Sequence, residues 1–346
     1  MVTEFDESYV LTTLAGLNQR AETYRRMRPE HLIKVRELPR RTNAKLAGLV
    51  FLATAIKEAR SKEINYTIIS NLRGAAVAAI TRLCGGAPWI WYVHDYLHNR
   101  GRVRRIAAKI LFSSCAGWIA NSKDVGTVTR KLAGSRKVGA TFYYCVNPAK
   151  GFVPPTAQRI PMEEAVLFVG SINSWKGLQT LVEGLSRVKS ATGVAPRVDI
   201  VGQVVDPAYW EIVQQIAATN QLELRYLGMR DDVTSLMSEY EVLAHPTPAP
   251  EPFGLVVAEA ILAGCFVISS AMGGVRELLP SEMLECRFDP HNPESLISAM
   301  RAVREAQARY RRRQAQVISE LSSMTSEKGY SENLRSFFSA VGSSLA

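Results

Sequence analysis

With 346 residues, 47% of them hydrophobic, the chain is too long for a single ordinary core, and two domains are expected. Its first thirty residues are polar and partly acidic, and no apolar run approaches the ~18 residues that cross a bilayer, so neither a signal peptide nor a transmembrane helix is expected. The formal net charge is +10, and five scattered cysteines without a C-x-x-C pair favour a reducing compartment over a zinc site.

The N-terminal segment predicts helices more clearly than strands. Residues 1–3 resemble the tail of a strand, and Tyr9 to Met27 has the spacing of a helix, with three leucines on one face. A second helical stripe runs from Leu46 to Ile56.

A β-α-β unit follows. Tyr66–Ser70 and Trp89–His94 are the predicted strands, and Gly74–Leu83 is the predicted helix between them. Such units are parallel and right-handed, so His94 falls at the carboxyl end of its strand, where open α/β sheets bind ligands. A histidine there is either a hydrogen-bonded structural residue or a functional one. A metal site shared with His98 is not expected, because no third ligand lies nearby.

The next helix, Arg100–Phe112, combines apolar and basic residues. The apolar positions that share one face are Val103, Ile106, Ala107, Ile110 and Leu111, and the cations on the other faces are Arg102, Arg104, Arg105 and Lys109. We expect an ordinary surface helix that docks on the sheet through the apolar face; a helix at a membrane surface is the alternative. The first half ends with a strand at Gly117–Ala120, a helix at Lys123–Leu132 and a strand at Val138–Tyr144.

Positive charge is concentrated in this first half. Residues 1–150 contain 25 Lys or Arg and 10 Asp or Glu, a net +15, whereas residues 151–346 contain 17 and 22, a net −5. The asymmetry predicts an anionic partner for the first half, such as an anionic membrane surface or a lipid-linked phosphate. Nucleic acid is not expected as a partner, and solubility alone is the alternative explanation for the charge.

A proline-rich stretch predicts a linker near residues 150–162, so the domains are placed at residues 1–150 and 151–325. The second half again alternates strands and helices, which indicates a doubly wound parallel sheet. Its strands are expected at Val166–Gly170, Arg197–Val201, Leu224–Leu227 and Val242–His245, and its helices at Leu178–Lys189, Tyr209–Asn220 and Val233–Tyr240.

The stretch Glu251–Leu279 contains the largest group of candidate functional residues. It opens with a Glu-Pro-Phe-Gly turn, and the run from Leu255 to Ala263, apolar except for Glu259, predicts a buried helix that Gly264 ends. An unpaired buried carboxylate costs several kcal/mol, so Glu259 is expected to meet a protein donor or a ligand hydroxyl. A short strand is expected at Cys265–Ser270, and a new helix near Val275.

This stretch resembles the signature of the retaining glycosyltransferases of family 4, whose two-domain fold is called GT-B. The matching positions are Glu251, Phe253, Gly254, Glu259, Ala260, Gly264, Gly273, Gly274 and Glu277. The resemblance implies two Rossmann-like, doubly wound parallel-sheet domains facing a cleft, with the donor on the second domain and the acceptor on the first. It also implies a terminal helix over residues 326–346 that crosses back to the N-terminal domain.

The resemblance implies roles for individual residues. Glu251 would contact the donor sugar, Glu259 would hold the ribose hydroxyls, and the helix N-terminus near Gly254 would face the diphosphate, where free N–H groups favour an anion. Lys176 would contact the diphosphate, and His94 would lie close to the donor sugar. The expected catalytic residues are Glu251, His94 and Lys176, and the expected donor-binding residues are Gly170, Ser171, Lys176, Met229, Arg230, Glu251, Phe253, Gly254, Leu255 and Glu259.

Two features depart from the family pattern. Ser171 stands where an arginine is usual, so Arg230 or Arg276 is a candidate replacement cation. Residues 4–8 replace the glycine-rich loop that normally follows the first strand.

The sequence therefore predicts a metal-independent, hexosyl-type retaining glycosyltransferase without a cofactor. It would move a sugar from a nucleoside-diphosphate sugar to a glycan, lipid-linked or other hydroxyl acceptor in polysaccharide biosynthesis. It is expected in the cytoplasm or peripherally at the inner membrane face. The alternatives are a sugar-nucleotide epimerase or hydrolase of the same fold and a non-catalytic donor-binding subunit.

Overall fold

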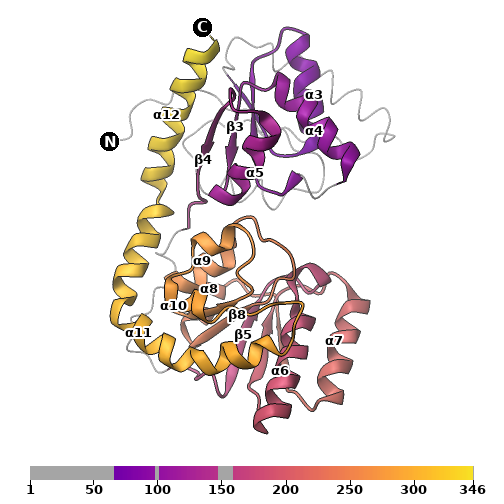
Figure 1. Cartoon of the computed structure of the whole chain (residues 1–346), viewed down its shortest axis with the longest axis vertical. Coiled ribbons are helices and arrows are strands. Elements are labelled where there is room, and N and C mark those ends of the chain that lie inside the picture. Colours follow the sequence, from indigo (N-terminus) through magenta and orange to yellow (C-terminus); the bar gives the residue numbers. More distant parts are fainter. Residues whose placement is uncertain (1–65, 98–100, 147–158, 346) are drawn as a thin grey trace. The chain divides into compact units, whose positions relative to one another are not determined.

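The computed structural model describes residues 66–97, 101–146 and 159–345 (Figure 1). Contacts divide these residues into two compact units. Unit 1 contains residues 66–97, 101–121, 125–142 and 334–345, and unit 2 contains residues 122–124, 143–146 and 159–333. The strand predicted at residues 1–3, the departure at residues 4–8, the helices predicted at 9–27 and 46–56, His98, and most of the linker lie outside the described residues.

Unit 1 contains a parallel sheet in the order β1-β2-β3-β4. The strands are β1 (Thr67–Ile69), β2 (Trp89–Val93), β3 (Gly117–Ala120) and β4 (Val138–Thr141), and the linking helices are α3 (Leu72–Leu83), α4 (Arg102–Ser114) and α5 (Lys123–Ala133). Because each right-handed crossover advances to the next strand, the three helices cover the same face. On the other face, Gly117 lies against Phe337 and Val341 of α12 (Glu327–Leu345), which leave no room for a larger residue there.

Aromatic residues fill the core between this sheet and its helices. Trp89, Trp91 and Trp118 are fully buried, and the ring of Phe112 stacks on Trp91 with centroids 4.3 Å apart. Residues 89–93 read as a continuous apolar strand because a central parallel strand is buried on both faces.

Helix α4 docks differently from the prediction. It is buried through Ala108 and Phe112, whereas Val103, Ile106 and Ile110 are 81%, 59% and 64% exposed. The prediction that the wide apolar face docks on the sheet is therefore wrong. Ala108 and Phe112 lie four residues apart, so they form a narrow stripe, and Phe112 fits against Trp91.

Unit 2 contains a five-stranded parallel sheet in the order β7-β6-β5-β8-β9. The strands are β5 (Ala165–Val169), β6 (Arg197–Val201), β7 (Leu224–Gly228), β8 (Val242–His245) and β9 (Phe266–Ser269), and the connecting helices are α6 (Leu178–Thr192), α7 (Pro207–Thr219), α8 (Val233–Ser238) and α9 (Leu255–Leu262). Every strand and helix predicted for this sheet is confirmed, with ends that shift by at most three residues.

The strand order of unit 2 reverses next to β5. The chain moves from β5 outward to β6 and β7, returns past β5 to β8, and continues to β9. Right-handed crossovers in opposite directions place α6 and α7 on one face and α8 and α9 on the other (Figure 1). The switch point thus falls between β5 and β8, and open α/β sheets bind ligands at the carboxyl ends of strands at such a point.

After β9 the chain forms the 3₁₀ turn η3 (Gly274–Glu277), α10 (Ser281–Glu285) and the long α11 (Ser295–Met324). The helix predicted near Val275 is thus only a short turn, because Pro280 cannot continue it. In the part of the chain that the structure describes, no helix is long and apolar enough to span a bilayer.

Candidate functional site

An ion pair lies at the switch point of unit 2. Lys176 follows β5 and Glu251 follows β8, and the Lys176 Nζ is 2.8 Å from the Glu251 Oε2. Their side chains are only 28% and 15% exposed, so their attraction is less screened than that of a surface pair. The fold therefore brings together two residues that the sequence assigned to one site.

A tight turn sets the position of Lys176. The 3₁₀ turn η2 (Ser174–Lys176) starts at Asn173, whose side-chain oxygen accepts a hydrogen bond from the Lys176 N–H at 3.2 Å. Gly177 then has φ 73°, and a Cβ there would lie 2.1 Å from the carbonyl oxygen of Pro246. Only glycine satisfies both requirements, and the loop after β5 is therefore pressed against the loop after β8.

Gly170 and Ser171 begin the same loop. The Lys176 stem passes Gly170, since a Cβ at Gly170 would be 3.6 Å from the Lys176 Cγ. The Ser171 hydroxyl accepts a hydrogen bond from the Asn173 Nδ2 at 2.9 Å. Ser171 thus supports the turn and contributes no charge at the position of the missing arginine.

The loop that carries Glu251 is also tied to the loop after β9. The Glu251 N–H donates to the Met272 carbonyl at 3.0 Å, and Glu251 forms an isolated parallel bridge with Gly273. Three loops at the carboxyl edge of the sheet therefore meet at Glu251.

Helix α9 begins beside this junction and has an uncapped N-terminus. Gly254 precedes it with φ 89°, and among the residues that the structure describes no side chain accepts from the N–H groups of its first turn. Leu255, the first helical residue, is 44% exposed. The first-turn N–H groups and the positive end of the helix dipole can therefore receive an anion.

Glu259 lies one turn into α9 and is partly buried. Its side chain makes no hydrogen bond or ion pair among residues 66–97, 101–146 and 159–345. Burial raises the pKa of its carboxyl group. Of the two partners expected from the sequence, the described residues supply no protein donor to this carboxylate.

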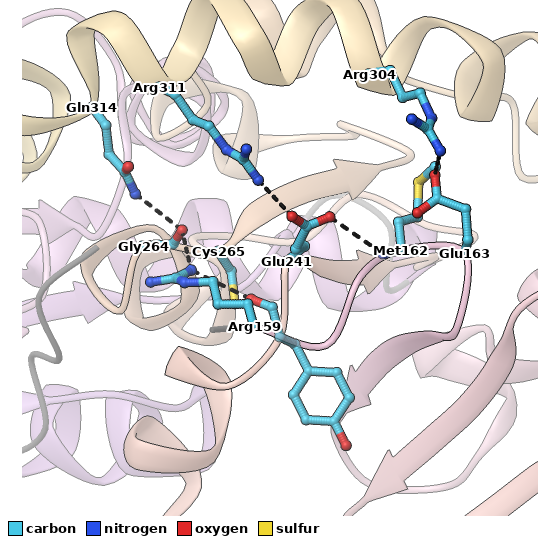
Figure 2. Close-up of polar contacts among 10 residues, drawn as sticks. Arg159, Met162, Glu163, Glu241, Gly264, Cys265, Arg304, Arg311 and Gln314 are labelled. Atoms are coloured by element: carbon cyan, nitrogen blue, oxygen red, sulfur yellow. Dashed lines mark hydrogen bonds and ion pairs between the residues drawn. The ribbon is translucent and has the colours of Figure 1, made fainter. Parts of the chain in front are cut away.

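The C-terminal end of α9 is anchored by Arg159 (Figure 2). Its guanidinium donates to the carbonyls of Gly264 at 2.5 Å, Ala263 at 3.0 Å and Tyr240 at 3.3 Å. Gln314 of α11 donates to the same Gly264 carbonyl at 3.0 Å. A cation at this end also complements the negative end of the helix dipole. Arg159 therefore fixes the C-terminal end of α9 and leaves the N-terminus of α9 open.

The other predicted donor-binding residues have contrasting environments. Phe253 is 2% exposed and packs against Tyr143 and Tyr144, with ring centroids 6.0 and 5.2 Å away. Met229, by contrast, is 68% exposed after β7. Phe253 therefore shapes the turn before α9, whereas Met229 presents an open surface.

The two candidate replacement cations differ in their partners. Arg230 makes two bonds to the carboxylate of Asp232, at 2.8 and 2.6 Å. Arg276 is exposed, and its guanidinium makes no hydrogen bond or ion pair within the described part of the chain. It follows Gly273 and Gly274, next to Glu251, so Arg276 is the cation free to reach an anion here.

Glu277 is the last residue of the motif and accepts hydrogen bonds from groups of unit 2. Its carboxylate accepts hydrogen bonds from the N–H groups of Lys123 and Asp124 at 2.9 and 2.8 Å and from the Tyr143 hydroxyl at 2.7 Å. The same carboxylate and burial raise the pKa of Tyr143. Glu277 is thus fully engaged by the protein.

His94 belongs to unit 1, directly after β2, and is partly buried with the Tyr92 ring 6.4 Å away. It occupies the carboxyl end of its strand, as the sequence indicated. Within the described residues, no group of three His, Cys, Asp or Glu residues is placed to hold a metal ion.

Sequence reasoning missed two residues that support the site. Arg159 lay in an expected linker, and its partners are 81 to 105 positions away. His245 was assigned only to the end of a strand, yet it is buried between two hydroxyl groups. A histidine at the carboxyl end of a buried strand was the available signal for the second.

Comparisons with known proteins show the family and the fold that this chain resembles. Residues 163–305, which lie in unit 2, match the family model described as Glycosyl transferases group 1. An uncharacterized glycosyltransferase of Methanocaldococcus jannaschii is 27% identical over 135 residues, or 39% of this chain. That alignment spans 34% of the relative's own length.

Solved structures resemble nearly the whole chain. Anabaena HepE in complex with UDP and glucose has a TM-score of 0.75 at 19% identity, covering 96% of this chain and 100% of its own. Sucrose-phosphate synthase of Thermosynechococcus elongatus has a TM-score of 0.77 at 14% identity and covers 98% and 100%. A glycosyltransferase of Rickettsia africae has a TM-score of 0.78 at 15% identity and covers 99% and 99%. The GT-B fold and the resemblance to group 1 glycosyltransferases are therefore confirmed.

Proposed function

We propose that this protein is a retaining glycosyltransferase that transfers a hexosyl group from a nucleoside-diphosphate sugar to a hydroxyl acceptor without a metal ion. The acceptor would be a glycan or a lipid-linked molecule, as in polysaccharide biosynthesis. The observation that carries the proposal is the environment of Glu259. A partly buried carboxylate without a partner among the described residues, on a helix whose N-terminus is open, suits a ligand that presents hydroxyls and an anion together.

The charges around α9 support this assignment. Lys176, Arg276 and the first-turn N–H groups of α9 would face the diphosphate, and Glu251 would contact the donor sugar. Negative charge builds on the departing nucleoside diphosphate, so fixed cations and N–H dipoles lower the barrier more than they strengthen ground-state binding. Met229 and Arg230 would lie near the nucleobase, and His94 of unit 1 would lie near the transferred sugar.

A panel of sugar nucleotides tests the function. UDP-glucose and UDP are the first ligands to try, because the similar HepE structures hold UDP, glucose and UDP-glucose. A donor at 100 times its dissociation constant should add about 2.7 kcal/mol to stability. Sugar transfer should require an acceptor, whereas nucleotide release without any acceptor would indicate a hydrolase or an epimerase. If no sugar nucleotide binds, the proposal is wrong.

Glu259→Gln should have opposite effects on stability and on binding. The folded-state pKa of Glu259 is raised above its ordinary value of 4.5, so the charged carboxylate destabilises the ligand-free fold as pH rises through that pKa. The neutral variant should therefore melt at a higher temperature at pH 7, and this advantage should vanish below pH 4.5. Donor affinity should fall by roughly tenfold to 100-fold, because charge-assisted bonds to the ribose are lost.

Thermal melts with and without donor, at pH 4 and pH 7, measure both effects. Glu211→Gln in α7 is the matched control, because it makes the same change at an exposed carboxylate elsewhere in unit 2 and should not change the donor shift. An unchanged donor affinity in folded Glu259→Gln would remove the ribose assignment.

We also propose that unit 1 brings the protein to an anionic membrane surface. Its described residues include eleven Lys or Arg and a single acidic residue, Asp95. Helix α4 has exposed Val103, Ile106 and Ile110 among its four cations, and none of these cations forms an ion pair within the described residues. Exposed apolar side chains flanked by cations match an interface of acyl chains beneath anionic headgroups.

Vesicle co-sedimentation tests this second proposal. Binding should require anionic lipid, weaken with added salt, and fall by about 100-fold when Arg102, Arg104 and Arg105 become Gln, since each cation contributes ~1 kcal/mol. Changing Arg301, Arg304 and Arg312 of α11 to Gln removes equal charge from unit 2 and should leave binding unchanged. Equal pelleting with neutral and anionic vesicles, or none with either, would contradict the membrane proposal.

A further inference from the structure

A buried histidine links the loops that form the candidate site. His245 is the last residue of β8 and is 6% exposed. Its Nδ1 is 3.1 Å from the Ser269 Oγ at the end of β9, and its Nε2 is 3.1 Å from the Thr247 Oγ1 in the following loop. Both ring nitrogens are therefore engaged by hydroxyl groups.

Ser269 and Thr247 also make hydrogen bonds that fix the conformation of the neighbouring loop. The Ser269 Oγ accepts a hydrogen bond from the Ala271 N–H at 2.9 Å, and Ala271 has φ 53°, which is costly for a residue with a side chain. The Thr247 carbonyl accepts from the Ser270 hydroxyl at 2.7 Å. His245 thus joins the start of the loop that carries Glu251 to the start of the loop that leads to Gly273.

The loop that carries Lys176 contacts the residue next to His245. Pro246, between His245 and Thr247, places its carbonyl oxygen where only Gly177 leaves room, directly after Lys176. His245 is therefore buried next to the loops that carry Lys176, Glu251 and Arg276.

A neutral imidazole has one donor and one acceptor nitrogen, so it can bond both hydroxyls: one hydroxyl donates to the ring and the other accepts from it. Burial lowers the pKa of His245 to about 4; the nearby Glu251 charge opposes this effect and the Lys176 charge adds to it. The ring is therefore neutral at physiological pH, with both nitrogens engaged by hydroxyl groups.

We infer that His245 is a positioning residue for glycosyl transfer. By bridging Ser269 and Thr247, it fixes the position of Lys176 relative to Glu251. This inference rests on the proposed function of the site. It assigns the histidine no contact with the substrate: the imidazole fixes two loop starts, and the loops place the charged side chains. A displacement of about 1 Å at such residues can cost about 100-fold in rate.

Three substitutions separate bridging from simple space filling. The amide nitrogen of His245→Asn falls near the position of Nδ1 and retains the bond to Ser269, whereas that of His245→Gln falls near Nε2 and retains the bond to Thr247. His245→Leu fills the space and bonds neither. Val267→Ala is the matched control, because it weakens the fully buried β9 without touching a hydroxyl.

We expect His245→Leu to lower kcat about 30-fold with a donor KM within about threefold of the parent, well below the melting temperature. His245→Asn and His245→Gln should each recover part of that loss. The pH dependence of kcat/KM should keep its shape in both amide variants. A vanished limb in that profile would instead identify His245 as a proton-transfer group and overturn the positioning role.

Amide hydrogen exchange on the ligand-free protein gives a readout that does not need activity. His245→Leu should speed exchange in the segments 170–178, 246–256 and 270–278 together, and Val267→Ala should not. If exchange responds in this way but no sugar nucleotide is turned over, the proposed function fails and the bridge stands. If exchange in the three segments is unchanged in His245→Leu, the bridge itself is wrong.

Discussion

Replacing Lys176 with alanine is expected to lower kcat about 100- to 1,000-fold while nucleoside binding stays within a few-fold of the parent. The Lys176 ammonium is held at the switch point by Glu251, 2.8 Å away, so its charge is already positioned before the diphosphate arrives. A preorganised cation at developing negative charge contributes mainly to the transition state, and removing one such group costs about 10²–10³ in rate. The alanine also leaves the Glu251 carboxylate without its partner.

Single-turnover kinetics and titration with the nucleoside and its diphosphate measure the two effects separately. Lys328→Ala is the matched control, because it removes an exposed lysine that pairs with a glutamate outside the site, and it should change kcat less than threefold. Arg276→Gln should give an intermediate loss, because Arg276 has no partner among the described residues. Equal diphosphate affinity and an unchanged rate in Lys176→Ala would make Lys176 an ordinary lysine of a surface loop.

Replacing Arg159 with methionine is expected to lower the free energy of unfolding by about 2–4 kcal/mol. The guanidinium donates to the Gly264 carbonyl at the end of α9 (Figure 2) and to the carbonyls of Ala263 and Tyr240. Methionine leaves the Ala263 carbonyl without that donor. Hydrogen bonds from a charged group contribute about 1.5–3 kcal/mol each, but Gln314 still serves Gly264, so the losses do not simply add. The melting temperature should fall by roughly 5–10 °C.

Arg304→Met provides the comparison within the same view (Figure 2). Arg304 pairs with Glu163 at 2.6 Å, but the two side chains are 76% and 49% exposed, and such pairs contribute about 0–1 kcal/mol. Urea denaturation of both variants should therefore give very different midpoints with similar slopes. Equal midpoints would show that Arg159 does not anchor α9.

The sequence by itself determined the alternation of strands and helices and the position of the motif. Periodicity and turn residues are local signals, so β5 to β9 and their helices were predicted with ends that shift by a few residues. Glu251 and Glu259 were found because their spacing, and the place of Glu259 in an apolar helix, are also local. The apolar stripe of α4 was visible too, but periodicity alone could not choose between it and the narrower stripe of Ala108 and Phe112 that packs in the core.

Only the tertiary structure decided which side chains meet. Lys176 and Glu251 are 75 positions apart, and they meet because the strand order reverses between β5 and β8. The same sheet edge brings Ser269 to His245, and the end of α9 brings Ala263 and Gly264 to Arg159. Hydrogen bonds and ion pairs depend on distances of a few ångströms between segments far apart in the chain, and no local pattern in the sequence specifies those distances.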